Sequence, residues 1–174
     1  MKIVMCASEV VPFAKTGGLA DVAGALPLAL EEEGQEVIVI MPRYKSIQNA
    51  KSSTIGKNVK VYFIENEGYF NRDNLYGEKT GDYPDNLERF SFYCKRALEL
   101  LKEINFQPDI IHVHDWQASL IPVYLKTIYA NDEFFKKTKT ILTVHNIGYQ
   151  GLFPQEQFQT LGLDPSLFGV DGLE

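Results

Sequence analysis

Lys15, Thr16 and two adjacent glycines stand directly before a run of residues with helical spacing. Adjacent glycines are costly to order, so their turn needs either unusual backbone angles or a backbone free of side chains. The N–H groups of Gly17 and Gly18 can approach an anion closely, Lys15 adds a positive charge, and the following helix offers its positive end. The residue order is not that of a Walker phosphate loop. An anion site and a plain glycine turn, with Thr16 or Asp21 as helix-end polar groups, both fit this stretch.

A second group of chemically capable side chains surrounds two histidines. His112 and His114 lie two residues apart, so on a strand both face the same side, where Asp115 and His145 can complete a metal site. Such sites usually need further ligands, and the chain has only three histidines. A core histidine with a satisfied hydrogen bond is therefore the favoured interpretation of His112. Asp115 beside Trp116 suits a sugar instead, because a carboxylate binds hydroxyls while an indole covers the apolar ring face.

Short apolar runs and helical periodicities alternate along the chain. The apolar runs predict buried strands at residues 2–8, 36–42, 59–64, 108–114 and 139–145. The periodic segments predict helices at residues 19–30, 90–104 and 120–128, with a kink at Pro27 in the first. Residues 65–86 are polar and predict a long loop. The alternation predicts an α/β fold: a Rossmann-like, mainly parallel sheet with helices on both faces and strand order 3-2-1-4-5.

The unusual polar residues fall where predicted strands end. In a parallel sheet of this kind, ligands bind beyond the carboxyl ends of the strands, near the switch in strand order. Four strands lead into such clusters, which contain the Lys15 turn, Tyr76, Asp115 with Trp116, and His145 with Asn146. One ligand site on one rim of the sheet is therefore predicted.

Composition narrows the classes of function. The 174 residues suggest one domain with a real core, and 23 acidic against 17 basic residues give a net charge of −6, which argues against a nucleic-acid-binding surface. Cys6 and Cys94 fall in a predicted strand and helix and indicate buried thiols of a reducing compartment. The first residues do not form a signal peptide, and no apolar stretch approaches the length of a membrane span. A cytoplasmic protein without nucleic-acid or membrane partners is expected, and its oligomeric state is left open.

Three stretches resemble bacterial and plant glycogen (starch) synthases, which are retaining glycosyltransferases of the GT-B fold that use ADP-glucose. They are KIVMCASEVVPFAKTGGLADVAGALPLAL, HVHDWQASLIPVYLK and TVHNIGYQGLFP, and the resemblance runs from the first residue to the last. It implies that residues 1–174 form the N-terminal, acceptor-side Rossmann-like domain in truncated form. The C-terminal domain, which holds most of the nucleotide in GT-B enzymes, would then be absent.

The resemblance also implies roles for individual residues. Lys15 would contact the donor's phosphates, with the glycine backbone lining that approach, and His145 would sit beside the transferred glucose. The catalytic residues implied are His145 and Asp115, and the substrate-binding residues are Lys15, Thr16, Gly17, Gly18, Asp21, Tyr76, Trp116 and Asn146. No metal and no cofactor are implied.

The reaction implied is transfer of glucose from ADP-glucose to the non-reducing 4-hydroxyl of an α-1,4-glucan, with retention. No carboxylate in this stretch is an obvious nucleophile, so a same-face route is expected, with catalysis carried largely by charge stabilisation. The chain alone is expected to be inactive because most groups that stabilise the leaving diphosphate lie in the second domain. Two alternatives stay open: a non-catalytic glucan-binding module, and a metal-dependent hydrolase using His112, His114 and Asp115.

Overall fold

A six-stranded sheet forms the centre of the chain. The computed structural model describes residues 1–47, 50–169 and 172–173. In sheet order the strands are β3 Ser52–Ile55, β4 Val59–Ile64, β2 Glu36–Pro42, β1 Lys2–Cys6, β7 Ile110–His114 and β8 Lys139–Thr143. All neighbouring pairs are parallel except β3 with β4. The order predicted for the five parallel strands is confirmed, because those strands are β1, β2, β4, β7 and β8.

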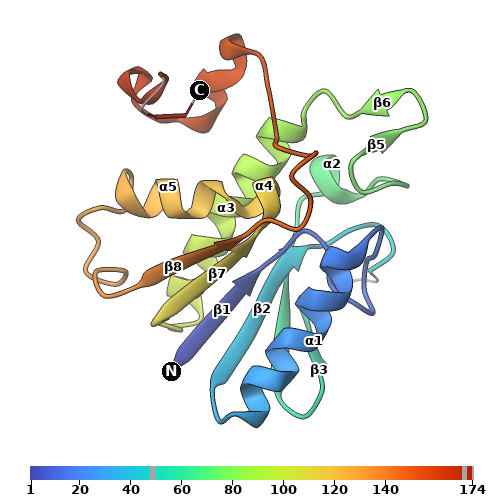
Figure 1. Cartoon of the computed structure of the whole chain (residues 1–174), viewed down its shortest axis with the longest axis vertical. Helices are drawn as coiled ribbons and strands as arrows, with labels where there is room; N and C mark the ends of the chain where they lie inside the picture. The colour runs from blue at the N-terminus through green and yellow to red at the C-terminus, as the bar shows by residue number, and fades with distance from the viewer. Residues whose placement is uncertain (48–49, 170–171, 174) are drawn as a thin grey trace.

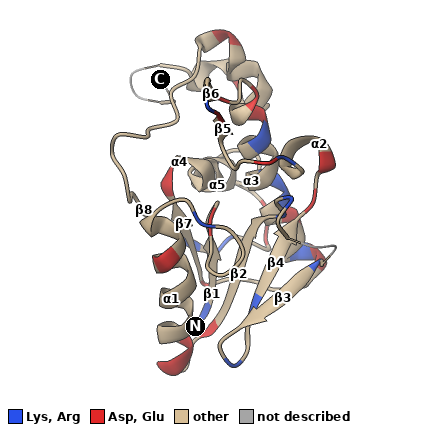
Figure 2. Cartoon of the chain, turned by 90° about the vertical axis from the view of Figure 1, so that its right-hand side faces the viewer, with Lys and Arg blue, Asp and Glu red and all other residues tan. Residues whose placement is uncertain are grey.

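Helices cover both faces of this sheet, as predicted. In Figure 1, α1 (Gly18–Glu32) lies in front of the strands and α3 (Asn86–Glu103) behind them. Figure 2, turned by 90°, shows α1 along one side of the sheet. Val4 and Met5 point to opposite faces of β1, and neither is exposed to solvent. Burial on both faces explains why the inner strands are continuous apolar runs.

Several elements differ from the prediction. The antiparallel edge strand β3 was missed, because its residues are mostly polar and only Ile55 is buried. The helix expected at residues 120–128 corresponds to α5 (Leu120–Lys126), which ends before Ile128, and a short helix that was not predicted, α4 (Asp115–Ala118), precedes it. The first helix continues through Pro27, and the kink expected there stays a prediction.

The segment predicted as a long loop, residues 65–86, contains regular structure. It holds the short helix α2 (Glu67–Phe70) and a hairpin of β5 (Gly77–Glu78) and β6 (Gly81–Asp82). The fully buried Arg89 on α3 fastens this segment. Its Nε donates to the carbonyl of Tyr69 at 2.7 Å, and its Nη2 donates to that of Leu75 at 3.0 Å.

Asn86 on α3 completes this anchoring. Its Oδ1 accepts Nη1 of Arg89 at 2.6 Å, and its Nδ2 donates to the carbonyl of Tyr76 at 2.8 Å. Burial lowers the pKa of Arg89, and the faces of Phe70 and Phe90 lie against its guanidinium. The start of α3 thereby fixes Tyr76 at the rim of the sheet.

The remaining segment returns over the helices. Two 3₁₀ helices, η1 (Gln155–Leu161) and η2 (Pro165–Leu167), follow β8, and η1 packs on α3. Cys6 and Cys94 are both buried free thiols, as predicted. Within the described residues, no helix is long and apolar enough to cross a membrane.

Candidate active site

A polar pocket of about 620 Å³ opens at the carboxyl ends of the parallel strands. Its walls come from the segments that follow β1, β4, β7 and β8, which is the single rim predicted from the sequence. Eight of the ten predicted site residues line it: Thr16, Gly17, Gly18, Tyr76, Asp115, Trp116, His145 and Asn146. Their roles in binding and catalysis stay predictions.

Lys15 and Asp21 do not line this pocket. The Lys15 ammonium lies 2.7 Å and 2.8 Å from the two carboxylate oxygens of Asp21, and both side chains are more than half exposed. The turn that carries Lys15 borders the pocket through Thr16, but the lysine side chain itself is turned to Asp21. A ligand that recruits the ammonium therefore competes with Asp21 for it.

The two glycines of the turn lie in open space. The φ of Gly17 is −146°, and neither glycine adopts a left-handed backbone conformation. A Cβ added at Gly17 or at Gly18 would meet nothing within 4 Å. Two explanations for the glycine pair were considered. The explanation by unusual backbone angles is therefore wrong, whereas the explanation by a backbone free of side chains agrees with the open space around both glycines.

The carboxylate of Glu9 occupies part of the expected anion site. It accepts the backbone N–H of Thr16, the Thr16 hydroxyl at 2.6 Å and the N–H of Gly17 at 3.2 Å. Glu9 is only 3% exposed, and sequence analysis missed it. The available signal was a single charged residue in an otherwise uncharged stretch, residues 3–14. The Gly17 N–H predicted for a ligand is therefore already engaged by the chain itself.

Tyr76 joins the same network from the opposite wall. Its hydroxyl donates to Oε1 of Glu9 at 2.6 Å and shares a hydrogen bond with Oγ of Ser8 at 2.7 Å. Burial raises the pKa of Tyr76 well above its ordinary value, and the electrostatic effects of the nearby Tyr44 and Glu9 raise it further. Tyr76 therefore stays a neutral donor that ties the residue 65–86 segment to the glycine turn.

The three histidines form a stack. The ring centroids of His112 and His114 are 4.3 Å apart, and those of His114 and His145 are 5.1 Å apart. Nδ1 of His114 lies 2.8 Å from Nε2 of His145, and Nε2 of His112 lies 2.7 Å from the hydroxyl of Thr143. His112 thus has the satisfied hydrogen bond that sequence analysis favoured.

This geometry does not form the metal site considered for a hydrolase. His114 and His145 are directly hydrogen-bonded, so no ion can lie between those two nitrogens. Nowhere in the described part of the chain do three or more His, Cys, Asp or Glu side chains gather as metal ligands. Burial, followed by the neighbouring His112 and His145, lowers the pKa of His114 to about 3, which keeps its ring neutral.

Asp115 and Trp116 hold the two ends of one loop, residues 145–151. Asp115 adopts a positive φ of 56°, and its Oδ1 accepts the backbone N–H of His145 at 2.6 Å. The Trp116 indole packs against Gly151, where an added Cβ would lie 2.7 Å from the ring, and it meets the Phe153 ring edge-to-face at 5.3 Å. Gly151 therefore occupies ring surface that was expected to face a sugar.

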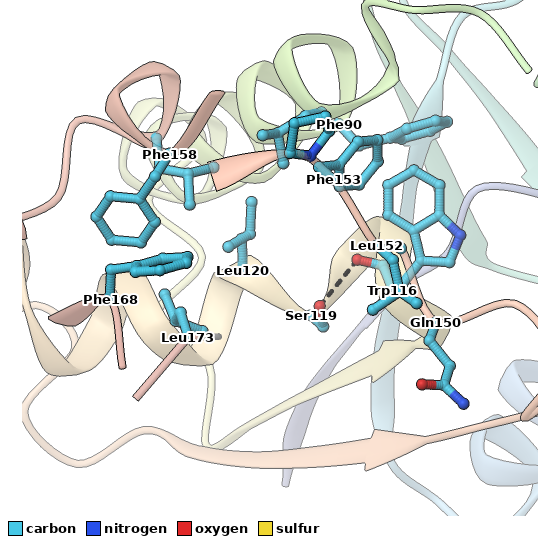
Figure 3. A pocket seen from close by; sticks show the side chains of 14 residues that line it. Phe90, Trp116, Ser119, Leu120, Gln150, Leu152, Phe153, Phe158, Phe168 and Leu173 are labelled. Carbon is cyan, nitrogen blue, oxygen red and sulfur yellow. Dashed lines mark hydrogen bonds between the residues drawn. The ribbon is translucent and has the colours of Figure 1, made fainter. Parts of the chain in front are cut away.

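A second, apolar pocket of about 230 Å³ lies behind this indole (Figure 3). Trp116 lines both pockets, and the Phe90 ring meets it edge-to-face at 5.1 Å. The indole is thus a partition between the polar pocket and the apolar packing that supports it.

Three kinds of comparison with known proteins, by family model, by sequence and by structure, find the same kind of protein. The family model described as the starch synthase catalytic domain matches residues 2–174. The glycogen synthases of Geotalea daltonii and Thermotoga petrophila are 48% and 40% identical to this chain over all of its length. The chain spans 41% of the length of either relative. The catalytic domain of starch synthase IV from Arabidopsis thaliana, solved with ADP and acarbose, superposes with a TM-score of 0.84 at 30% identity, over 98% of this chain and 39% of that one.

Proposed function

This chain belongs to the glycogen and starch synthase family of glycosyltransferases, and from that premise we propose that it supplies the acceptor-side half of a glucosyltransferase active site. The proposed reaction moves glucose from ADP-glucose to the non-reducing end of an α-1,4-glucan with retention. One observation carries the proposal: four strand ends contribute to a single polar pocket, in a chain matched to the family along its length. The ADP and acarbose bound to the Arabidopsis relative support the choice of donor and acceptor.

The donor's phosphates are assigned to the N-terminal end of α1. This helix has 15 residues and no side-chain cap, so the N–H groups of its first turn, beginning at Gly18, are available to an anion. The carboxylate of Glu9 repels an anion from Thr16 and Gly17, which moves the favourable position toward Gly18. Lys15 reaches such a ligand once it leaves Asp21.

The glucan is assigned to the opposite wall, where polar side chains can bind sugar hydroxyls. Asp115, Asn146 and Tyr149 supply acceptors and donors there. Two of the pocket's carboxylates, those of Glu9 and Asp115, are engaged as hydrogen-bond acceptors within the chain. Both carboxylates thus contribute to the structure of the chain itself, and the same-face route to retention, which needs no carboxylate nucleophile, is the route that we propose.

A chimera tests this function. Residues 1–174 are joined to the remainder of the Geotalea daltonii synthase, and incorporation of labelled glucose from ADP-glucose into glycogen is measured. The chimera should transfer glucose, whereas the chain alone should not. A folded chimera without activity would overturn the proposal. Glucan binding by the chain, combined with an inactive chimera, would favour the glucan-binding module instead.

We also propose that the reaction takes place in the cytoplasm. The two cysteines are free, buried thiols, which agrees with a reducing compartment.

A further inference from the structure

The buried Nε2 of His114 bears on which ring nitrogens of His114 and His145 carry protons. The residue is not exposed to solvent, and its Nε2 has no hydrogen-bond partner in the described part of the chain. Its other nitrogen, Nδ1, faces Nε2 of His145 at 2.8 Å. One proton must lie between these two nitrogens for a hydrogen bond to exist, so either His114 or His145 donates it.

The two arrangements differ in what they leave on Nε2 of His114. If His145 donates, the neutral His114 ring carries its proton on Nε2, where a buried N–H has no acceptor. If His114 donates from Nδ1, its Nε2 is a bare acceptor. Among buried backbone groups, orphaned N–H donors are rarer than under-satisfied acceptors. We apply the same preference to the buried Nε2 of His114, and it favours the second arrangement. The low pKa of His114, about 3, excludes the form with both nitrogens protonated at neutral pH.

We infer that His114 is a positioning residue that donates from Nδ1 to Nε2 of His145 and thereby fixes the proton of His145 on Nδ1. His145 lines the polar pocket, and its Nδ1 bonds to no other described residue. Nδ1 of His145 therefore presents an N–H donor to a ligand in the pocket. Because Nδ1 already carries a proton, it has no lone pair with which to accept a hydrogen bond. The catalytic consequence, a hydrogen bond donated to a substrate oxygen, rests on the proposed function.

Nitrogen-15 NMR of the labelled chain at neutral pH tests the proton arrangement directly. Couplings between ring nitrogens and carbon-bound hydrogens separate the two tautomers of each histidine. Protonated Nδ1 on both His114 and His145 is expected. Protonated Nε2 on His145 overturns the inference, whatever the activity of the protein.

Three variants separate positioning from packing. His114→Asn retains an amide N–H near the position of Nδ1, so His145 should keep its tautomer. His114→Phe retains the stacked ring without the donor, so protonated Nε2 should appear on His145. His112→Phe is the matched control, because its ring stacks in the same column but bonds Thr143, and His145 should not change. The wild-type spectrum alone decides the question if a variant does not fold.

Activity of the chimera tests the catalytic consequence separately. His114→Phe should lower kcat/KM about tenfold, the effect of one lost hydrogen bond, and His114→Asn should restore most of it. An inactive wild-type chimera overturns the proposed function and leaves the tautomer result standing. An altered tautomer with unchanged kinetics overturns the catalytic consequence alone.

Discussion

Glu9 and Thr16 are joined twice, because the Glu9 carboxylate accepts both the backbone N–H and the hydroxyl of Thr16. A side chain of the protein thus supplies the anion that the glycine turn coordinates. Because Tyr76 donates to the same carboxylate, the turn and the residue 65–86 segment share one acceptor. The shape of the pocket depends on that acceptor.

Glu9→Gln should lower the free energy of unfolding by roughly 1–3 kcal/mol, because an amide NH₂ group would face N–H donors in a buried place. Urea titration measures the change. Glu32→Gln, at the exposed end of α1, is the control and should change it by less than about 0.5 kcal/mol. Equal stability of the two variants would contradict a structural role for Glu9.

Lys15→Ala in the chimera should reduce kcat/KM for ADP-glucose roughly ten- to a hundredfold, because a charge-assisted contact to phosphate is lost. Its effect on unfolding should be below about 1 kcal/mol, since the Lys15–Asp21 pair is exposed. Lys57→Ala, in the turn between β3 and β4, is the kinetic control. Unchanged donor kinetics would remove Lys15 from the site.

The sequence predicted the five parallel strands and their order because burial on both faces leaves an unmistakable apolar pattern. The edge strand β3 escaped prediction because its pairing with β4 rests on backbone hydrogen bonds and requires few apolar side chains. The residue 65–86 segment escaped for a different reason. Its conformation is set by Arg89, whose hydrogen bonds reach backbone carbonyls up to 20 residues away.

The candidate site was predictable to the extent that strand ends gather on one rim. From that rule and the family resemblance ten residues were predicted to share one site, and eight of them line one pocket. Neither gave an indication of how they contact each other. The importance of Glu9 becomes visible only when Tyr76, 67 residues away, is seen to donate to it. The pairing of Lys15 with Asp21 depends on side-chain orientation in the folded chain.

Arg89→Lys should lower the free energy of unfolding by roughly 2–4 kcal/mol, because an ammonium cannot reproduce three separately directed hydrogen bonds. The control is Arg96→Lys on the same helix. Arg96 forms partly exposed ion pairs with Glu99 and Glu103, so its replacement should cost less than about 1 kcal/mol. Chemical denaturation compares the two, and equal losses would contradict the anchoring role.

His114 should make the protein less stable as the pH falls. Its folded pKa of about 3 lies below the value near 6.5 expected in the unfolded chain. Between those values the unfolded state binds the proton, so stability falls with falling pH by up to ~1.4 kcal/mol per unit. His112, whose pKa is also lowered by burial and by His145, acts in the same direction.

The measurement is urea unfolding at about pH 7 and about pH 5 for the wild type and for His114→Asn. The variant should lose less stability over this interval, and the comparison cancels the contribution of the carboxylates. Parallel losses in the two proteins would show that His114 titrates normally.

Gly151→Ala should displace the loop of residues 145–151 and lower the free energy of unfolding by roughly 1–3 kcal/mol. Its positive φ of 68° strains any other residue, and the added Cβ would overlap Trp116. Gly34→Ala is the control, because Gly34 has a φ of 79° with open space around it. Trp116 is the chain's single tryptophan, so its fluorescence should change in the first variant and not in the second.

The anchors at the two ends of this loop have a consequence for protein engineering. Asp115 and Trp116 are adjacent, yet one binds His145 and the other packs on Gly151. The span between those contacts, which includes the exposed Ile147 and Tyr149, is attached to the scaffold through neighbouring positions on α4. Residues 147–150 therefore form an exchangeable cassette, in which libraries can diversify the rim of the pocket while the strands and both anchors stay unchanged.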